Sequence, residues 1–361
     1  MLKLKITTYL KEYRIRVLKS TVKVFVEKMV LQKNMNILYV QNLGYVLIFV
    51  LCAIIFFMYL GDDYKRFLQP FTNRRDFIVE WLGAHGVKSV VMPIDGHEHI
   101  YVVFPKECYS PVFKIKTVIA HYDIFNGSPG ANDNSSSVFA MMNWAVRLLK
   151  DGGQHNVRLV FTDGEEIVSG AGGNVCAGAK SGVFSQGAFG LANVFKRLNI
   201  TDDDVYVFDC VGRGTVPVVA KNVLSKKVPE KFKKKFFALK EQTELVLSSA
   251  SGGKFVTLPV SYSDNAGFLA NGIAAVCVTM LPVEEANKYM YDLMRFPPLE
   301  DFVMNHKVAD GVQKNELENM LPETWKKLHT RDDSFESLSE DSFVLMEKIL
   351  DCIAALKTIC S

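Results

Sequence analysis

The longest apolar run in this 361-residue chain lies near its N-terminus. No charged side chain occurs between Lys33 and Asp62, and residues 43–60 form an apolar stretch of 18 residues, close to the roughly 20 that a helix needs to cross a bilayer. A buried core helix and a cleaved signal peptide are the alternatives to a membrane span. Because FMYLGDDY offers no small-residue cleavage site, the pattern favours an uncleaved signal anchor, a single transmembrane helix within residues 37–61.

After residue 62 the apolar runs become short, and strand-like runs alternate with runs of helical spacing. Strands are predicted at residues 89–93, 100–104, 114–121, 157–162, 204–209 and 273–280. Helices are predicted at residues 64–84, 134–150, 190–198 and 341–358, and Pro70 indicates that the first is kinked or broken in two. This alternation predicts an α/β fold around a mostly parallel sheet.

Charge is distributed unevenly along the chain. The sequence carries 42 Lys and Arg against 39 Asp and Glu, a net charge of +3 that does not suggest a nucleic-acid-binding protein. Residues 1–36 hold nine basic and two acidic side chains, a net charge of +7, which leaves −4 for the rest. Because basic residues mark the cytoplasmic side of a membrane helix, we expect a cytoplasmic segment at residues 1–36, the anchor in the lipid bilayer at residues 37–61, and a folded body outside the cytoplasm at residues 62–361.

Acidic and imidazole side chains gather where predicted strands end or loops begin. These are His121, Asp133, Glu165, Glu166, Asp209 and His329. Singly, each has an ordinary explanation; Asp133, for example, could cap the helix that follows it. Together they supply the imidazole and carboxylate ligands that zinc accepts, at the sheet edge where ligands of α/β proteins gather. Two adjacent glutamates also suit a division of labour in which one binds metal and the other moves protons.

Five motifs, HYD, GANDNSSS, FTDGEE, VFDCVGRG and LHTRDD, follow one another along the chain. In order and separation they resemble family twenty-eight of the metallopeptidases, zinc aminopeptidases to which glutaminyl cyclases are related. The resemblance covers residues 103–361. It implies a three-layer α/β/α sandwich with a mostly parallel central sheet and two zinc ions per chain.

The resemblance also implies a role for each ligand. His121 and Asp209 would bind one zinc ion, and Asp133 would bridge the two ions. Glu166 and His329 would complete the second zinc site.

Glu165 would be the general base that takes the proton of the attacking water and gives it to the leaving amine. Carboxylates near the metals would hold the free α-amine of a peptide, so that the first residue is removed. The function that the resemblance implies is therefore a membrane-anchored zinc aminopeptidase whose substrates are peptides with a free N-terminus.

Three further residues match family positions around the metals, namely Asp123, Asp333 and Asp264. Asp123 and Asp333 would orient the two histidines. Asp264 matches an acidic residue that is more often followed by His in the family. Here Asn265 follows it in SYSDNAGF, so the resemblance does not imply a substrate contact for residue 265. Phe268 and the Gly-rich loop at residues 167–187 are candidates for the side-chain pocket.

Two other functions are compatible with the same ligands. Glutaminyl cyclases use a single zinc ion, and their pockets contain tryptophans, one of them directly before the last histidine. This chain has Leu328 there and only Trp81, Trp144 and Trp325 in total, which favours a peptidase. A metal-free binding module is the third reading, but such relatives usually lose ligands or the base, and here all six positions are filled.

Overall fold

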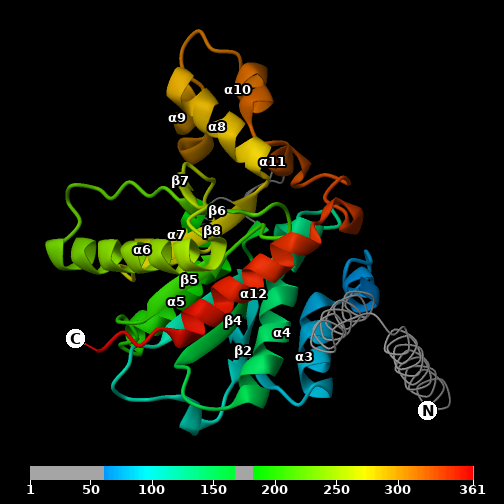
Figure 1. Cartoon of the computed structure of the whole chain (residues 1–361), viewed down its shortest axis with the longest axis vertical. Coiled ribbons are helices and arrows are strands. Elements are labelled where there is room, and N and C mark those ends of the chain that lie inside the picture. Colours follow the sequence, from blue (N-terminus) through cyan, green and yellow to red (C-terminus); the bar gives the residue numbers. More distant parts are fainter. Residues whose placement is uncertain (1–60, 167–181, 361) are drawn as a thin grey trace, which may run out of the picture. The chain divides into compact units, whose positions relative to one another are not determined.

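The computed structural model describes residues 61–166 and 182–360 (Figure 1). The chain divides into two compact units, residues 1–65 and residues 66–361, and the second is described below. Among the described residues, no helix is both long enough and apolar enough to span a membrane. The predicted basic segment at residues 1–36 and all but the last residue of the predicted anchor at residues 37–61 lie outside the described residues, so both stay predictions.

One eight-stranded sheet organises the second unit, with the strand order β1-β2-β4-β3-β5-β8-β6-β7. The strands are β1 (Lys88–Ile94), β2 (His97–Val103), β3 (Lys116–His121), β4 (Val157–Thr162), β5 (Asp204–Phe208), β6 (Val216–Ala220), β7 (Val256–Leu258) and β8 (Ala275–Leu281). The four central strands β4, β3, β5 and β8 are parallel, and β7 is parallel to β6. The pairs β1–β2, β2–β4 and β6–β8 are antiparallel, so the sheet is mixed but mostly parallel.

Helices cover both faces of this sheet. The helices are α3 (Arg74–Ala84), α4 (Ser136–Asp151), α5 (Gly187–Arg197), α6 (Glu230–Ser251), α7 (Asn265–Ala270) and α12 (Glu340–Ala355), together with α8 to α11. On β5, the hydroxyl of Tyr206 accepts a hydrogen bond from Gln242 of α6. Its neighbour Val207 faces the other way and packs in one cluster with residues of α5 and α7. Helix α12 packs against α4 and α6 (Figure 1). Since α6 covers one face of the sheet and α5 and α7 cover the other, the unit has three layers, helix, sheet and helix.

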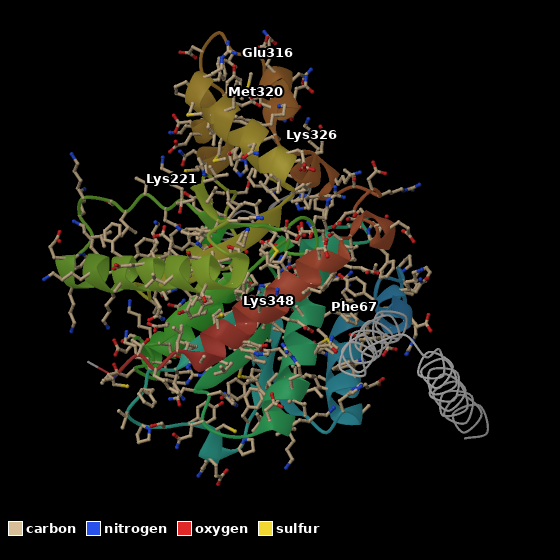
Figure 2. The ribbon with its side chains drawn as sticks, viewed as in Figure 1. Phe67, Lys221, Glu316, Met320, Lys326 and Lys348 are labelled. Atoms are coloured by element: carbon tan, nitrogen blue, oxygen red, sulfur yellow. The ribbon has the colours of Figure 1, made fainter. Side chains whose placement is uncertain are left out.

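A further group of helices stands on the end of the sheet that carries β6 and β7. It consists of α8 (Val283–Arg295), α9 (Pro298–Asn305), α10 (Lys314–Met320) and α11 (Glu323–Lys327). Tyr289 and Leu299 pack with Val218 and Leu281 of the sheet in a common apolar cluster. Lys221, which follows β6 and is labelled in Figure 2, also forms an ion pair with Glu300 at 2.6 Å.

The predicted interruption at Pro70 is confirmed, since residues 61–67 are helical and α3 begins only at Arg74. Other elements differ from the sequence predictions. The helix predicted from residue 134 begins only at Ser136, because Asp133 and Asn134 have non-helical backbone angles and the peptide bond between them is cis. Strands β6 and β7 and helices α6 to α11 were not predicted.

Candidate metal centre

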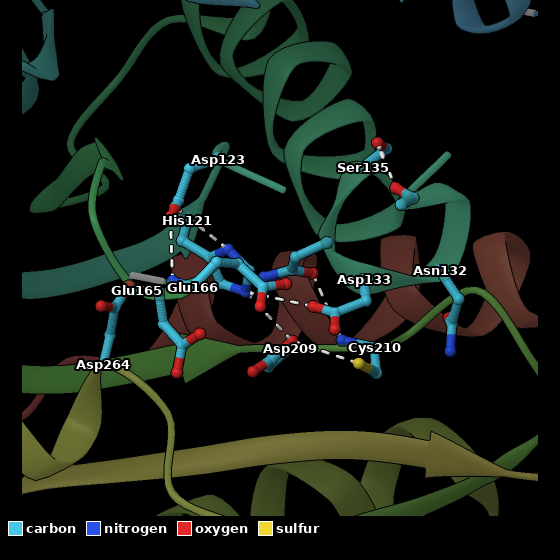
Figure 3. A network of polar contacts seen from close by, with 12 residues as sticks. His121, Asp123, Asn132, Asp133, Ser135, Glu165, Glu166, Asp209, Cys210 and Asp264 are labelled. Carbon is cyan, nitrogen blue, oxygen red and sulfur yellow. Dashed lines mark hydrogen bonds and ion pairs between the residues drawn. The ribbon is translucent and has the colours of Figure 1, made fainter. Parts of the chain in front are cut away.

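The six predicted ligand and base residues meet at one edge of the sheet. Figure 3 shows His121, Asp133, Glu165, Glu166 and Asp209 there. His121 is the last residue of β3, and Asp209 directly follows β5. Glu165 and Glu166 lie in the loop after β4, while Asp133 lies in the kinked, non-helical segment before α4. Since β3, β4 and β5 are parallel neighbours, their carboxyl ends coincide, and residues that are far apart in sequence become neighbours.

The first candidate metal group consists of His121, Asp133 and Asp209, whose ligand atoms all lie within 4.8 Å of one another. Nε2 of His121 is 3.3 Å from Oδ1 of Asp133 and 3.5 Å from Oδ1 of Asp209. One imidazole and two carboxylates thus converge on a common point, which is a donor set that zinc accepts.

The second group consists of Asp133, Glu166 and His329. Nε2 of His329 is 3.3 Å from Oδ2 of Asp133 and 3.1 Å from Oε2 of Glu166. Asp133 therefore faces the first group with one carboxylate oxygen and the second group with the other. This is the placement that a carboxylate bridging two metal ions requires.

Unsatisfied polar atoms at this site support metal binding. Nε2 of His121, which faces Asp133 and Asp209, and both carboxylate oxygens of Glu166 are buried without a hydrogen-bond partner among the described residues. Burying such groups without partners is costly, and divalent cations bound at the two groups would satisfy them. The donor set and its unsatisfied atoms therefore fit zinc.

The charges of the metal-free centre shift its pKa values. Contacts with Asp133 and then with Glu166 raise the pKa of His329 to about 10. Burial raises the pKa of Glu166 to about 7 and that of Glu165 well above its usual value. The pKa of Asp133 is lowered, since its contacts with the rings of His121 and His329 outweigh the opposing effect of burial. The centre thus strongly favours added positive charge.

Asp123 lies where the sequence predicted it. Its Oδ1 is 3.4 Å from Nδ1 of His121, and its Oδ2 accepts a hydrogen bond from the backbone N–H of Glu166 at 2.9 Å. One carboxylate therefore orients a ligand from each of the two metal groups.

Asp333 contacts the turn that carries Asp133. Its carboxylate accepts hydrogen bonds from the backbone N–H groups of Asn132 at 2.7 Å and of Asp133 at 3.0 Å. Asp333 thus holds the turn that carries Asp133, and its predicted effect on the orientation of His329 stays a prediction. The ring that lies against His329 is Phe125, stacked at a centroid distance of 4.5 Å, and the sequence did not indicate it.

Asp264 is fully buried behind Glu165, and Figure 3 shows the two side chains close together. The hydroxyl of Thr162, the last residue of β4, donates a hydrogen bond to Oδ2 of Asp264. Burial raises the pKa of Asp264 to about 7. On the other side of Glu165, Nε2 of Gln186 donates a hydrogen bond to Oε1 of Glu165 at 3.3 Å, a contact that the sequence did not reveal.

A cavity of about 520 Å³ opens onto the metal groups. Asp133, Glu165, Asp209 and His329 line one side of it. Apolar side chains line much of the rest, among them Val260, Phe302, Val303, Leu321, Trp325 and Leu328. The cavity therefore joins a polar, acidic floor to an apolar wall, much of which comes from α9 and α11.

Phe268, predicted as a candidate for the pocket, does not line this cavity. Its side chain is completely buried and packs edge-to-face on Phe195 of α5 at a centroid distance of 5.7 Å. It belongs to the apolar core between the sheet and the helices α5 and α7. The predicted role of Phe268 is therefore wrong, because the first residues of α7 turn this ring inward.

Two adjoining groups of candidate ligands that share one carboxylate are an arrangement that hydrolases with two metal ions use. Comparison of the sequence with family models identifies the family. Residues 114–352 match the model of Peptidase family M28, and the chain belongs to this family. No curated protein matches the chain in sequence.

Solved structures with the same fold include three bacterial proteins. A glutaminyl cyclase from Bacteroides thetaiotaomicron, bound to N-acetylhistamine, has a TM-score of 0.53 at 15% identity, and the match covers 83% of this chain and 97% of that one. A Zn-dependent exopeptidase from Parabacteroides distasonis has a TM-score of 0.52 at 14% identity, with 83% and 97% covered. The LapA aminopeptidase from Legionella pneumophila has a TM-score of 0.51 at 13% identity, with 82% and 70% covered. These similarities establish the shared fold.

Proposed function

We propose that this protein is a zinc-dependent aminopeptidase that removes the N-terminal residue of peptides. The observation that carries the proposal is the position of Asp133, whose two carboxylate oxygens face two separate groups of ligands. Membership in Peptidase family M28 supports peptides as the substrate class.

His121, Asp133 and Asp209 would hold one zinc ion, and Asp133, Glu166 and His329 would hold the second. Zinc bound there would supply Lewis acidity toward the scissile carbonyl oxygen and toward water. Asp123 fixes the ring of His121 and the backbone of Glu166, and Asp333 fixes the turn of Asp133, so the ligand directions are set before an ion binds.

Glu165 is the residue suited to move protons. It lines the cavity next to the metal groups, and its burial raises its pKa well above the usual value for a glutamate. A carboxylate with a raised pKa accepts a proton from water and returns it to a leaving amine more readily near neutral pH. The acidic floor suits a free α-amine, and the apolar wall suits the side chain of the N-terminal residue.

The experiment combines metal content and turnover of the purified chain. We expect two zinc ions per chain at neutral pH and release of nitroaniline from aminoacyl-nitroanilides. Fewer than one zinc per chain would contradict the enzymatic function and would favour the metal-free binding module.

Glutaminyl cyclase activity is the second candidate, because Trp325 lines the cavity although it does not directly precede His329. An aromatic wall of this kind suits the cyclase pocket described above. Incubation with a peptide that begins with glutamine separates the two functions. Loss of ammonia without peptide cleavage would identify a cyclase, whereas release of the free amino acid would identify an aminopeptidase.

We further propose that residues 37–61 anchor the protein in a membrane, with residues 1–36 in the cytoplasm and the catalytic domain outside it. The uncharged apolar run and the +7 charge that precedes it support this arrangement. Protease added to intact cells should degrade the catalytic domain while a tag before Met1 stays protected. The opposite protection pattern would contradict the orientation.

A further inference from the structure

Glu165 occupies a position from which it could serve either of two roles. A carboxylate oxygen of Glu165 lies within 4.8 Å of ligand atoms of both His121 and Glu166, so these three residues form a third group able to hold a metal ion. If Glu165 bound the ion, its carboxylate could not move protons. Something in the structure must therefore keep this carboxylate out of the metal shell.

Gln186 is the side chain that contacts the Glu165 carboxylate directly, through the hydrogen bond from its Nε2 to Oε1. Gln186 is only 5% exposed and precedes α5 as its N-cap residue. An N-cap side chain usually accepts a hydrogen bond from the first turn of the helix, but that of Gln186 makes no such bond. Its amide is used on Glu165 instead.

The backbone fixes this contact. The N–H of Gly187 donates a hydrogen bond to the carbonyl of Gly164 at 3.1 Å, which ties the start of α5 to the loop that carries Glu165. A Cβ atom at position 187 would lie 1.9 Å from the carbonyl oxygen of Asp163, so this approach requires glycine. Gln186 is consequently held beside Glu165 by two segments that pack backbone to backbone.

We propose that Gln186 determines the role of Glu165: its side-chain amide binds the Glu165 carboxylate and keeps it available for proton transfer instead of metal binding. Gln186 is thus a positioning residue that acts through Glu165. The proposal rests on the proposed function for its catalytic part, but its metal-binding part can be tested without any substrate.

The variant Gln186→Met keeps the size of the side chain and removes the donor. In the full-length, zinc-loaded protein, the freed Glu165 joins the zinc ligands, so zinc release to a chelator should slow by about tenfold or more while kcat falls by about ten- to one-hundredfold. Faster or unchanged zinc release would overturn the proposal, since a purely structural role for Gln186 would loosen the site.

Two controls make the result specific. In a Glu165→Gln background, Gln186→Met should leave zinc release unchanged, because an amide is a poor zinc ligand; equal slowing in both backgrounds would overturn the proposal. Gln313→Met removes a glutamine that also precedes a helix without capping it, at α10 and outside the cavity lining, and should leave both readouts at wild-type values.

Failure of the proposed function would look different. If the wild-type protein binds zinc but cleaves neither class of substrate, aminopeptidase and cyclase activities are excluded. The rates of zinc release in Gln186→Met and in the double variant still decide whether Gln186 restrains Glu165.

Discussion

The carboxylate of Asp333 accepts a hydrogen bond from the backbone N–H of Asp133 at 3.0 Å, and so supports the bridging ligand from a position 200 residues away in sequence. Replacing Asp333 with Ala leaves two buried N–H groups unpaired, which costs about 1–3 kcal/mol for each group. We expect Asp333→Ala to unfold at lower denaturant concentration and to bind zinc more weakly, as measured by urea unfolding and by zinc titration.

The neighbouring Asp332 provides the matched control, because its side chain is exposed. Asp332→Ala should leave unfolding and zinc affinity close to wild type. Equal effects of the two substitutions would show that Asp333 does not support the Asp133 turn.

The two adjacent glutamates should respond differently to substitution. Glu165→Gln removes the proton acceptor but no proposed ligand, so zinc content should stay at the wild-type value while kcat falls by about 10²–10⁴-fold. Glu166→Ala removes a ligand of the second metal group and should lower the zinc content. Atomic absorption and turnover of aminoacyl-nitroanilides measure both effects, and near-normal turnover of Glu165→Gln would refute its assignment as the base.

Substitution of Phe268, in the core, should have a different effect from substitution of Phe302, in the cavity wall. Phe268 is fully buried in the core, so Phe268→Ala should destabilise the protein by about 3–5 kcal/mol, with little change in KM for the fraction that remains folded. Phe302 lines the cavity, so Phe302→Ala should raise KM for substrates with a large apolar N-terminal residue. If Phe268→Leu changed the substrate preference, Phe268 would have to contact the substrate, contrary to its position in the core.

Two buried histidines predict a loss of stability in acid. Burial lowers the pKa of His99 and of His155 to about 4, compared with about 6.5 in an unfolded chain. A depressed folded pKa means that the unfolded state binds the proton more tightly, so stability is retained above pH 6.5 and lost as pH falls toward 4. Each residue should contribute about 3 kcal/mol to this loss.

Urea unfolding of the wild type and of His99→Gln between pH 4 and pH 7.5 tests the effect, and comparison at each pH cancels the common contribution of zinc release. The variant should lose less stability than the wild type as the pH falls, and His99→Gln/His155→Gln should lose still less. Parallel curves for all three proteins would show that neither histidine is buried in the neutral form.

The sequence allowed the prediction of the strands β3, β4 and β5 because they are buried on both faces and consist of short apolar runs. Since polar residues follow directly after these strands, the metal groups could be predicted as well. Helices α8 to α11 could not be predicted from the sequence. Each is short and packs only one side against β6, β7 and β8, and the local sequence does not indicate that contact. Gln186 was missed for a related reason, because its contact with Glu165 depends on the backbone of Gly164 and Gly187 meeting in space.

The two groups of metal ligands are completed at different stages of protein synthesis. The group of His121, Asp133 and Asp209 is complete once residue 209 has been synthesised, whereas the group with Glu166 must wait for His329, which follows β8 and the helices α8 to α11. A nascent chain therefore acquires the two sets of ligands in sequence, and Asp133 belongs to the early set before it can bridge to the late one. Translation that stops within α8 to α11 would yield a chain with one complete set of ligands and an unfinished partner set.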